Sequence, residues 1–280
     1  MAKIKNFLKA FIPPIAISFS RTLITKKVKN DKTETWSGDY ASWAEAKARC
    51  TGYDSANILE KCKNALLKVK NGQAVYERDS VLFDEIQYSW GLLAGLQKAA
   101  LENGGKLCVL DFGGSLGSTY YQNREFLSSL KSLQWCIVEQ PHFVDCGKEY
   151  FENKQLKFYP TIEECLMQFK PNVLLLSSVL QYLERPYEWI GKFVSLGIEN
   201  IIIDRTSFVE GDKDILTIQN VPENIYGGTY PAWFFGKFLL DYFKKKYTQV
   251  AIFDNWFTNP TILNGGKKVH WQGIIMKLRK

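Results

Sequence analysis

Residues 107–118, with the sequence LCVLDFGGSLGS, constrain the fold of this chain more than any other segment. The four apolar residues predict a strand inside a sheet, because a strand that is covered on both faces is apolar throughout. Asp111 ends the strand, and the following glycines allow a sharp turn whose backbone N–H groups face a ligand. This order is typical of α/β domains that bind nucleotides. A tight turn without a ligand is the alternative interpretation.

A second apolar strand and a second acid follow the glycine turn. Residues 120–130 have a helical pattern, residues 135–138 form an apolar strand, and Glu139 comes directly after it. In dinucleotide and nucleoside folds, an acid at this position accepts hydrogen bonds from the ribose hydroxyls, usually about 20 residues after the glycines. Glu139 lies somewhat farther along, which a longer helix accommodates. The alternative is a solvated glutamate at the end of a strand.

Length and composition restrict the class of protein. The 280 residues are 46% apolar and 14% aromatic, which is enough for one large α/β domain with additions. The six cysteines contain no Cys-x-x-Cys pair, which is typical of buried thiols in a reducing compartment. With two histidines, no metal site is expected. The net charge of +7 is dispersed and no nucleic-acid motif accompanies it, so we expect no nucleic-acid partner.

Three regions are expected along the chain. Residues 1–35 combine lysines with apolar residues, but two prolines interrupt the apolar run, and a bilayer span takes about 20 apolar residues. This segment either lies on an anionic membrane surface as a basic amphipathic segment or packs on protein. Residues 36–105 are expected to form a helical lid region, and residues 106–280 an α/β domain with an insert around 206–235.

The lid region is expected to contain three helices. Ser42 begins an S-x-x-E capping box for a helix over residues 43–50, and a second helix follows it. A third helix is expected from near residues 79–80 to 104–105, with core residues at helical spacing: Leu82, Phe83, Ile86, Trp90, Leu93 and Leu96. The three charges before it, Glu77, Arg78 and Asp79, are candidates for part of a ligand lid.

The rest of the chain alternates strands and helices. Short strands over residues 156–159, 173–176 and 201–203 raise the number of parallel strands to five. Residues 249–253 and 270–276 are two further strands. Since a glycine-bearing loop and its flanks are too short for a helical crossover between them, we expect these two strands to pair antiparallel.

These elements resemble the class I S-adenosylmethionine-dependent methyltransferases. The resemblance implies an α/β, Rossmann-like sheet of five parallel strands plus a C-terminal antiparallel pair, here with an N-terminal helical extension. Asp111, Gly113 and Gly117 match the acid-x-Gly-x-Gly-x-Gly pattern of that superfamily, whereas Ser115 replaces the middle glycine. Residues 139–142, EQPH, are similar to the acid-x-Pro-His segment of some small-molecule O-methyltransferases, whose acid holds the cofactor ribose.

A closer resemblance covers nearly the whole chain. The sequence resembles a bacterial family of methyltransferases found among genes for surface polysaccharides (lipopolysaccharide and capsule), through residues 36–40, 77–83, 111–118, 138–140, 177–183 and 203–206. It departs from that family at residues 226–233. The resemblance implies a cytoplasmic enzyme that methylates a small molecule, a sugar nucleotide or a lipid-linked glycan. Contact of residues 1–35 with a membrane would place it at the periphery of the inner membrane.

The candidate site residues follow from this resemblance and from the strand ends, where open α/β sheets bind ligands. Candidates for binding S-adenosylmethionine are Arg78, Asp111, Gly113, Gly114, Ser115, Gly117, Glu139, Gln140, Ser177 and Ser178. A guanidinium fork matches a carboxylate, so Arg78 is expected to pair with the methionyl carboxylate or else with its acidic neighbours. Candidates on the acceptor side are Asp79, Arg205, Tyr226, Tyr230 and Trp233, whose aromatic members either stack on a sugar or form the core of the insert.

A sugar hydroxyl loses its proton as it accepts a methyl group, which calls for a general base. Asp204, His142 and Tyr182 are the candidates. The alternatives are an ion pair of Asp204 with Arg205, packing for His142 and a wall position for Tyr182.

Two other functions compete with methyl transfer. A nicotinamide-dependent, sugar-modifying oxidoreductase would favour Gly-x-Gly-x-x-Gly, which the glycine turn fits poorly. A non-catalytic binding module that keeps the fold is the third interpretation.

Overall fold

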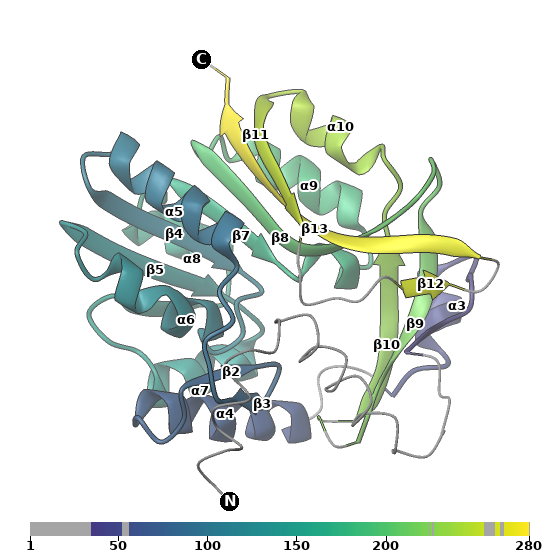
Figure 1. Ribbon diagram of the computed structural model, residues 1–280, viewed down its shortest axis with the longest axis horizontal. Helices are drawn as coiled ribbons and strands as arrows, with labels where there is room; N and C mark the ends of the chain where they lie inside the picture. Colours follow the sequence, from purple (N-terminus) through teal and green to yellow (C-terminus); the bar gives the residue numbers. More distant parts are fainter. Residues whose placement is uncertain are drawn as a thin grey trace, which may run out of the picture. The chain divides into compact units, whose positions relative to one another are not determined.

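A computed structural model describes residues 35–51, 56–223, 225, 227–254, 261–263 and 266–279 (Figure 1). The expected segment of residues 1–35 lies outside the described residues, apart from Thr35. The predicted α/β class is confirmed. Within this part of the chain, no helix is long and apolar enough to cross a membrane.

A mostly parallel sheet carries the fold. Among the described residues it has eight strands in the order β11-β13-β8-β7-β4-β5-β6, with β12 paired to β13. The strands are β4 (Lys106–Phe112), β5 (Ser132–Val138), β6 (Leu156–Tyr159), β7 (Val173–Ser177), β8 (Asn200–Val209), β11 (Tyr247–Asp254), β12 (Thr261–Leu263) and β13 (Lys267–Leu278). Strands β4 to β8 pair in parallel, whereas β13 is antiparallel to both β8 and β11. The predicted five parallel strands and antiparallel pair are therefore confirmed.

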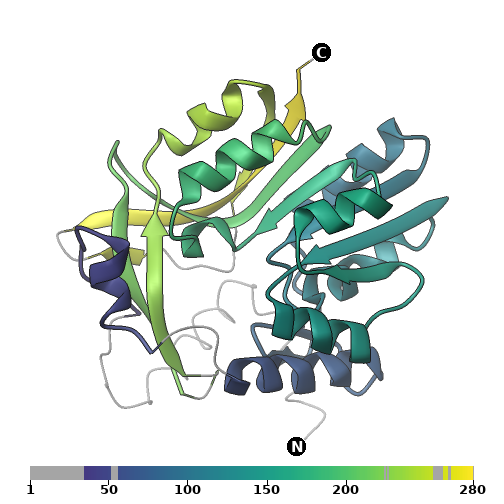
Figure 2. The ribbon, with the colours of Figure 1, turned by 180° about the vertical axis from the view of Figure 1, so that it is seen from behind.

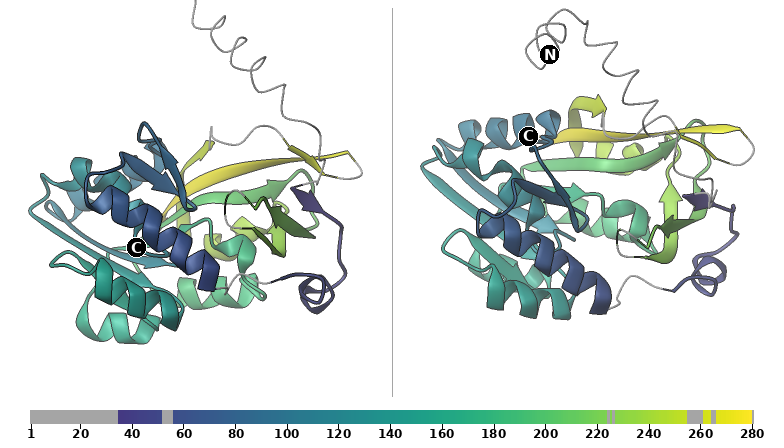
Figure 3. Two further views of the ribbon diagram at one scale, coloured as in Figure 1. Left: turned by 90° about the horizontal axis from the view of Figure 1, so that it is seen from below. Right: turned by 60° about the horizontal axis from the view of Figure 1, so that its bottom comes forward.

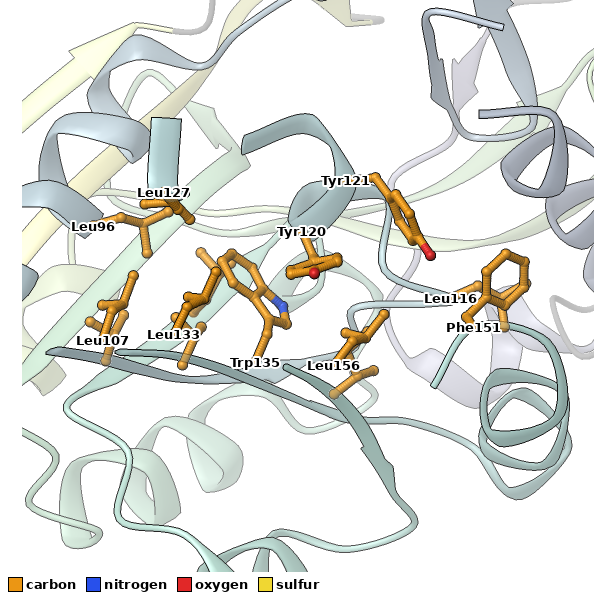
Figure 4. Close-up of a cluster of buried hydrophobic side chains, with 14 of the residues drawn as sticks. Leu96, Leu107, Leu116, Tyr120, Tyr121, Leu127, Leu133, Trp135, Phe151 and Leu156 are labelled. Carbon is orange, nitrogen blue, oxygen red and sulfur yellow. The ribbon is translucent and has the colours of Figure 1, made fainter. Parts of the chain in front are cut away.

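Helices cover both faces of this sheet (Figures 1 and 2). One face packs against α5 (Trp90–Glu102), α6 (Ser118–Leu127) and α7 (Pro141–Tyr150), and the other against α8 (Ile162–Gln168), α9 (Pro186–Ser195) and α10 (Leu239–Lys244). Because side chains alternate along a strand, Val109 and Leu110 of β4 enter opposite clusters. Figure 4 shows the first cluster, where Trp135 lies between Leu133 and Tyr120.

A second, antiparallel sheet joins two distant parts of the sequence. Its order is β1-β9-β10, with β1 (Trp36–Ser37), β9 (Ile215–Val221) and β10 (Gly228–Phe234). The short helix α3 (Trp43–Lys47) packs on this sheet, burying Ala46 against Leu216 and Ile218 (Figure 1). Residues 35–51 and the insert after β8 therefore form one unit.

The lid region differs from the expectation at its centre. After α3 and α4 (Ala56–Lys70), a hairpin of β2 (Tyr76–Arg78) and β3 (Val81–Phe83) precedes α5 (Figure 3). The prediction of a helix that begins near residues 79–80 is wrong, because Asp79 and Ser80 have φ angles of 51° and 67° and form the hairpin turn. Consecutive positive φ angles suit a tight hairpin and not a helix start.

This change also alters the expected core. Leu93 and Leu96 of α5 are buried as predicted, but Leu82 is 40% exposed and Trp90 is 57% exposed. The capping box is confirmed in part, since the Glu45 N–H donates to Ser42 Oγ at 3.2 Å while the helix ends at Lys47.

Candidate active site

A cavity of about 870 Å³ lies at the carboxyl ends of β4, β5 and β7. Small-molecule sites usually measure about 300–1,000 Å³. Eight of the ten residues predicted for the cofactor line this cavity: Asp111, Gly113, Gly114, Ser115, Glu139, Gln140, Ser177 and Ser178. The opposite wall comes from the second sheet and from α3. The strands thus bring together residues that lie more than sixty positions apart in the sequence.

The turn after β4 requires its glycines. Gly113 has a φ of 74°, and a Cβ atom there would lie 2.5 Å from the Val179 side chain. A Cβ on Gly114 would lie 2.6 Å from the Asp111 carboxyl group. Ser115 has a φ of 52°, so it adopts the left-handed conformation that a glycine would adopt easily. The backbone therefore lines the cavity without a side chain at two consecutive positions. Gly117, with a φ of 107°, caps α6 and does not line the cavity.

Asp111 is buried next to this turn. Its side chain is 1% exposed, and the Trp135 indole N–H donates to its Oδ2 at 2.9 Å. The Gly113 N–H donates to the Val138 carbonyl at 2.9 Å, which ties the turn to the end of β5. Burial raises the pKa of Asp111 to about 7, although the hydrogen bond from Trp135 acts in the opposite direction.

Glu139 occupies the end of β5 and lines the same cavity. The Gln140 N–H donates to Glu139 Oε2 at 3.2 Å. The backbone N–H of Glu139 donates to the Tyr159 carbonyl at 3.1 Å. Burial raises the pKa of Glu139 to about 7, the hydrogen bond from Gln140 lowers it and the charge of Asp111 raises it. An acceptor group for two adjacent hydroxyls therefore stands beside the glycine turn.

Tyr182 forms part of the opposite wall. It ends the 3-10 helix η2 (Leu180–Tyr182), donates its hydroxyl to Gln219 Oε1 at 2.9 Å and meets the ring of Tyr230 edge-on at 5.2 Å. Burial raises the pKa of Tyr182 to about 12. The phenol is therefore protonated at neutral pH, which favours the wall position over an acid–base role.

The predicted acceptor residues separate into two groups. Asp79, Arg205 and Tyr230 line the cavity. Trp233 does not, because its indole N–H donates to the Leu183 carbonyl at 3.1 Å and its ring stacks on Trp43 at 6.3 Å, inside the insert. Tyr226 lies outside the described residues.

Asp204 does not line this cavity; it lines a smaller cavity that shares Ser118, Thr119 and Arg205 with the main one. It is 2% exposed; its Oδ1 accepts from the Ser89 hydroxyl at 2.9 Å and its Oδ2 from the Ser177 hydroxyl at 2.8 Å. Arg205 Nε lies 3.5 Å from Oδ2. This placement disagrees with the predicted general-base role, because a base must reach the acceptor's proton. It favours the ion-pair alternative.

His142 is also absent from the cavity wall. It lies in the first turn of α7, 5.0 Å from the Phe143 ring. Its Nε2 is buried and has no hydrogen-bond partner among the described residues. The geometry therefore favours packing over the predicted general-base role for His142.

Glu77 fastens the β2–β3 hairpin to the rest of the protein. Glu77 is 2% exposed, and it accepts hydrogen bonds from the Ser118 hydroxyl and, at 3.2 Å, from the Ser80 N–H. Burial raises the pKa of Glu77 to about 7. Arg78 does not line the main cavity; its guanidinium carbon lies 5.2 Å from the centre of the Phe83 ring. Glu77 thus joins the hairpin turn to the start of α6.

Several cavity residues could not be recognised from the sequence, among them Lys47, Cys62, Gln219 and Asn220. Lys47, Gln219 and Asn220 lie on segments whose neighbours depend on the pairing of β1 with β9, for which two residues of strand give no local signal. Burial raises the pKa of Cys62 to about 12, so its thiol is neutral. In the part of the chain that the structure describes, no cluster of three or more His, Cys, Asp or Glu could hold a metal ion.

No protein-family model and no curated protein matches the sequence. Solved structures do align with it. The N-terminal domain of EvdMO1, crystallised in the presence of S-adenosylhomocysteine and D-fucose, has a TM-score of 0.47 at 9% identity, covering 80% of this chain and 100% of that one. The N-methyltransferase NodS of Bradyrhizobium japonicum, in complex with S-adenosylhomocysteine, has a TM-score of 0.41 at 10% identity, covering 76% and 99%. An S-adenosylmethionine-dependent methyltransferase from Clostridium acetobutylicum has a TM-score of 0.40 at 11% identity, covering 67% and 91%.

Proposed function

We propose that this chain is an S-adenosylmethionine-dependent methyltransferase that O-methylates a sugar or a sugar-linked group in the synthesis of bacterial surface polysaccharide. One observation carries the proposal: the glycine turn after β4 and Glu139 after β5 line the same cavity at the strand ends. Such a turn allows close approach of a ligand to the backbone, and the acid suits a ribose. The order of the parallel strands and the antiparallel β13 agree with the class I methyltransferase sheet.

The residues present fit this cofactor. A Cβ atom on Gly113 or Gly114 would clash with the side chain of Val179 or Asp111, so both positions require glycine and only backbone lines the cavity there. Glu139 would accept hydrogen bonds from the ribose hydroxyls, and Ser177 and Ser178 form the cavity wall at the end of β7. When bound, S-adenosylmethionine supplies a methyl group on a positively charged sulfur. The protein then has to align the acceptor oxygen with that methyl group, about 3 Å away, and to exclude water.

Asp79 takes the general-base role in this proposal. Three carboxylates are among the described residues that line the cavity: Asp79, Asp111 and Glu139. Asp111 is 1% exposed and accepts a hydrogen bond from Trp135, and Glu139 would hold the ribose. Asp79 is exposed at the hairpin turn, where it can receive the proton of an acceptor hydroxyl. The rings of Tyr182 and Tyr230 and the amides of Gln219 and Asn220 provide the apolar and polar surfaces that a sugar needs.

Two measurements test this function. Calorimetric titration of the protein with S-adenosylhomocysteine and, separately, with NADH is expected to show binding of the first and not the second. Transfer of a labelled methyl group from S-adenosylmethionine to a panel of nucleotide sugars and lipid-linked glycans then identifies the acceptor. Binding of NADH alone would contradict the proposal in favour of an oxidoreductase.

Glu139→Ala is expected to weaken the binding of S-adenosylhomocysteine about 10- to 100-fold. A two-point hydrogen bond between the ribose and a carboxylate is worth roughly 1.5–3 kcal/mol. The change is measured by calorimetry, with Glu163→Ala as the control, since that glutamate lies in the first turn of α8 and outside the cavity. An unchanged affinity in Glu139→Ala would remove Glu139 from the ribose site.

The affinity for S-adenosylhomocysteine is expected to rise with pH until it levels off above about 7. Glu139 binds two hydroxyls as an acceptor only when ionised, and burial raises its pKa to about 7. Below that pKa the affinity is expected to fall up to about tenfold per pH unit. Titrations between pH 5.5 and 8.5 measure the slope, which is expected to be shallower in Glu139→Gln. An equal slope in that variant would assign the titration to another group, such as Asp111.

A further inference from the structure

A smaller cavity of about 20 Å³ adjoins the main one, and Arg205, Ser118 and Thr119 line both. Ser118 and Thr119 are the first two residues of α6, a helix of ten residues. The N–H groups of a first helical turn have no partners inside the helix and carry partial positive charge. Arg205 and the two hydroxyl-bearing residues at the start of α6 therefore line both cavities.

Arg205 is the cation on the cofactor side of the main cavity. Among the described residues that line this cavity, the cations are Lys47 and Arg205. Lys47 ends α3, which packs on the second sheet, opposite the glycine turn. Arg205 Nη2 instead donates to Ser177 Oγ at 3.4 Å, at the end of β7, the strand that pairs with β4.

The backbone directs Arg205 to this position. The register between β8 and β13 shifts between Gln272 and Ile274, opposite Asp204 and Arg205, which marks a β-bulge. Arg205 lies inside β8 and has a φ of 48°. Bulges redirect side chains beside active sites, and a non-glycine residue persists at positive φ where the surrounding structure holds it. Asp204, fixed by two serine hydroxyls, lies 3.5 Å from Arg205 Nε and keeps the guanidinium in place.

We propose that Arg205, and not Arg78, binds the methionyl carboxylate of S-adenosylmethionine; this inference rests on the proposed function. A guanidinium fork binds a carboxylate through two parallel hydrogen bonds. Arg78 lines the smaller cavity but not the main one, and its guanidinium lies over the Phe83 ring. This assignment moves Arg205 from the acceptor side, where the sequence placed it, to the cofactor.

A comparison of two ligands distinguishes binding of the carboxylate from binding of the rest of the cofactor. S-adenosylhomocysteine and 5′-methylthioadenosine share the adenosine and the sulfur, but the second lacks the amino-acid group. We expect Arg205→Gln to weaken the first ligand about 10- to 100-fold by calorimetry, while the second ligand binds as it does to the wild type. Lys47→Gln and Arg78→Gln, the matched control variants, are expected to show no such ligand-selective loss.

Two results with the glutamine variants would overturn the assignment of Arg205. An equal loss for both ligands in Arg205→Gln would mean a structural role, and a selective loss in Arg78→Gln alone would identify Arg78 as the anchor. If thermal melting shows that Arg205→Gln does not fold, Arg205→Lys keeps the charge beside Asp204 but lacks the fork. That variant is expected to lose S-adenosylhomocysteine affinity selectively, and wild-type affinity would contradict the proposal. A wild-type protein that binds neither ligand would instead refute the proposed cofactor itself.

Discussion

Asp204→Ala is expected to lower the free energy of unfolding by about 3–5 kcal/mol, the usual cost of breaking a buried ion pair by removing one partner. The carboxylate is 2% exposed and accepts from the hydroxyls of Ser89 and Ser177. Removing it leaves both hydroxyls and the Arg205 guanidinium without this partner. Urea denaturation measures the loss.

Two further variants serve as comparisons for Asp204→Ala. Asp204→Asn keeps the shape and part of the hydrogen bonding, so it is expected to cost less, about 1.5–3 kcal/mol for hydrogen bonds to a charged group. Asp212→Ala removes an exposed partner of Lys237 and is expected to cost at most about 1 kcal/mol. If Asp204→Ala were as stable as the wild type but lacked methyl transfer, Asp204 would be the base after all.

Asp79→Asn is expected to lower turnover about 10²- to 10⁴-fold on the acceptor that the methyl-transfer panel identifies. This range is typical for the loss of a general base. Asparagine has the shape of aspartate but cannot take the proton, so the affinity for S-adenosylhomocysteine is expected to stay near that of the wild type. Steady-state kinetics and calorimetry measure the two quantities separately.

Asp84→Asn is the control for this prediction, since Asp84 is exposed on the same segment and does not line the cavity. Normal turnover in Asp79→Asn would contradict the general-base role. An equal loss of cofactor affinity and turnover would instead assign Asp79 to binding.

The part of the cavity at the ends of β4, β5 and β7 was predictable because its signals are local. The apolar run before Asp111, the glycines after it and the acid at position 139 each lie within a few residues of a strand end. Parallel strands then bring these ends to one edge of the sheet, independently of how the other segments of the chain pair. The predicted cofactor residues at the ends of β4, β5 and β7 therefore lie in one cavity.

The acceptor side was not predictable, because long-range pairing decides it. The turn of the β2–β3 hairpin is Asp79-Ser80 and carries no Asn-Gly or Asp-Gly signal. The orientation of Asp204 depends on a bulge opposite β13, about seventy residues later in the chain. A strand end alone suggests a residue that faces ligand, whereas the bulge directs Arg205 to the cavity and encloses Asp204.

A crystal structure of the protein with S-adenosylhomocysteine tests the central claim most directly. We expect the ribose hydroxyls within about 2.7–3.2 Å of the Glu139 carboxylate, and the chain from ribose to sulfur along Gly113 and Gly114. A ligand bound away from the ends of β4 and β5, or a ribose that makes no contact with Glu139, would contradict it.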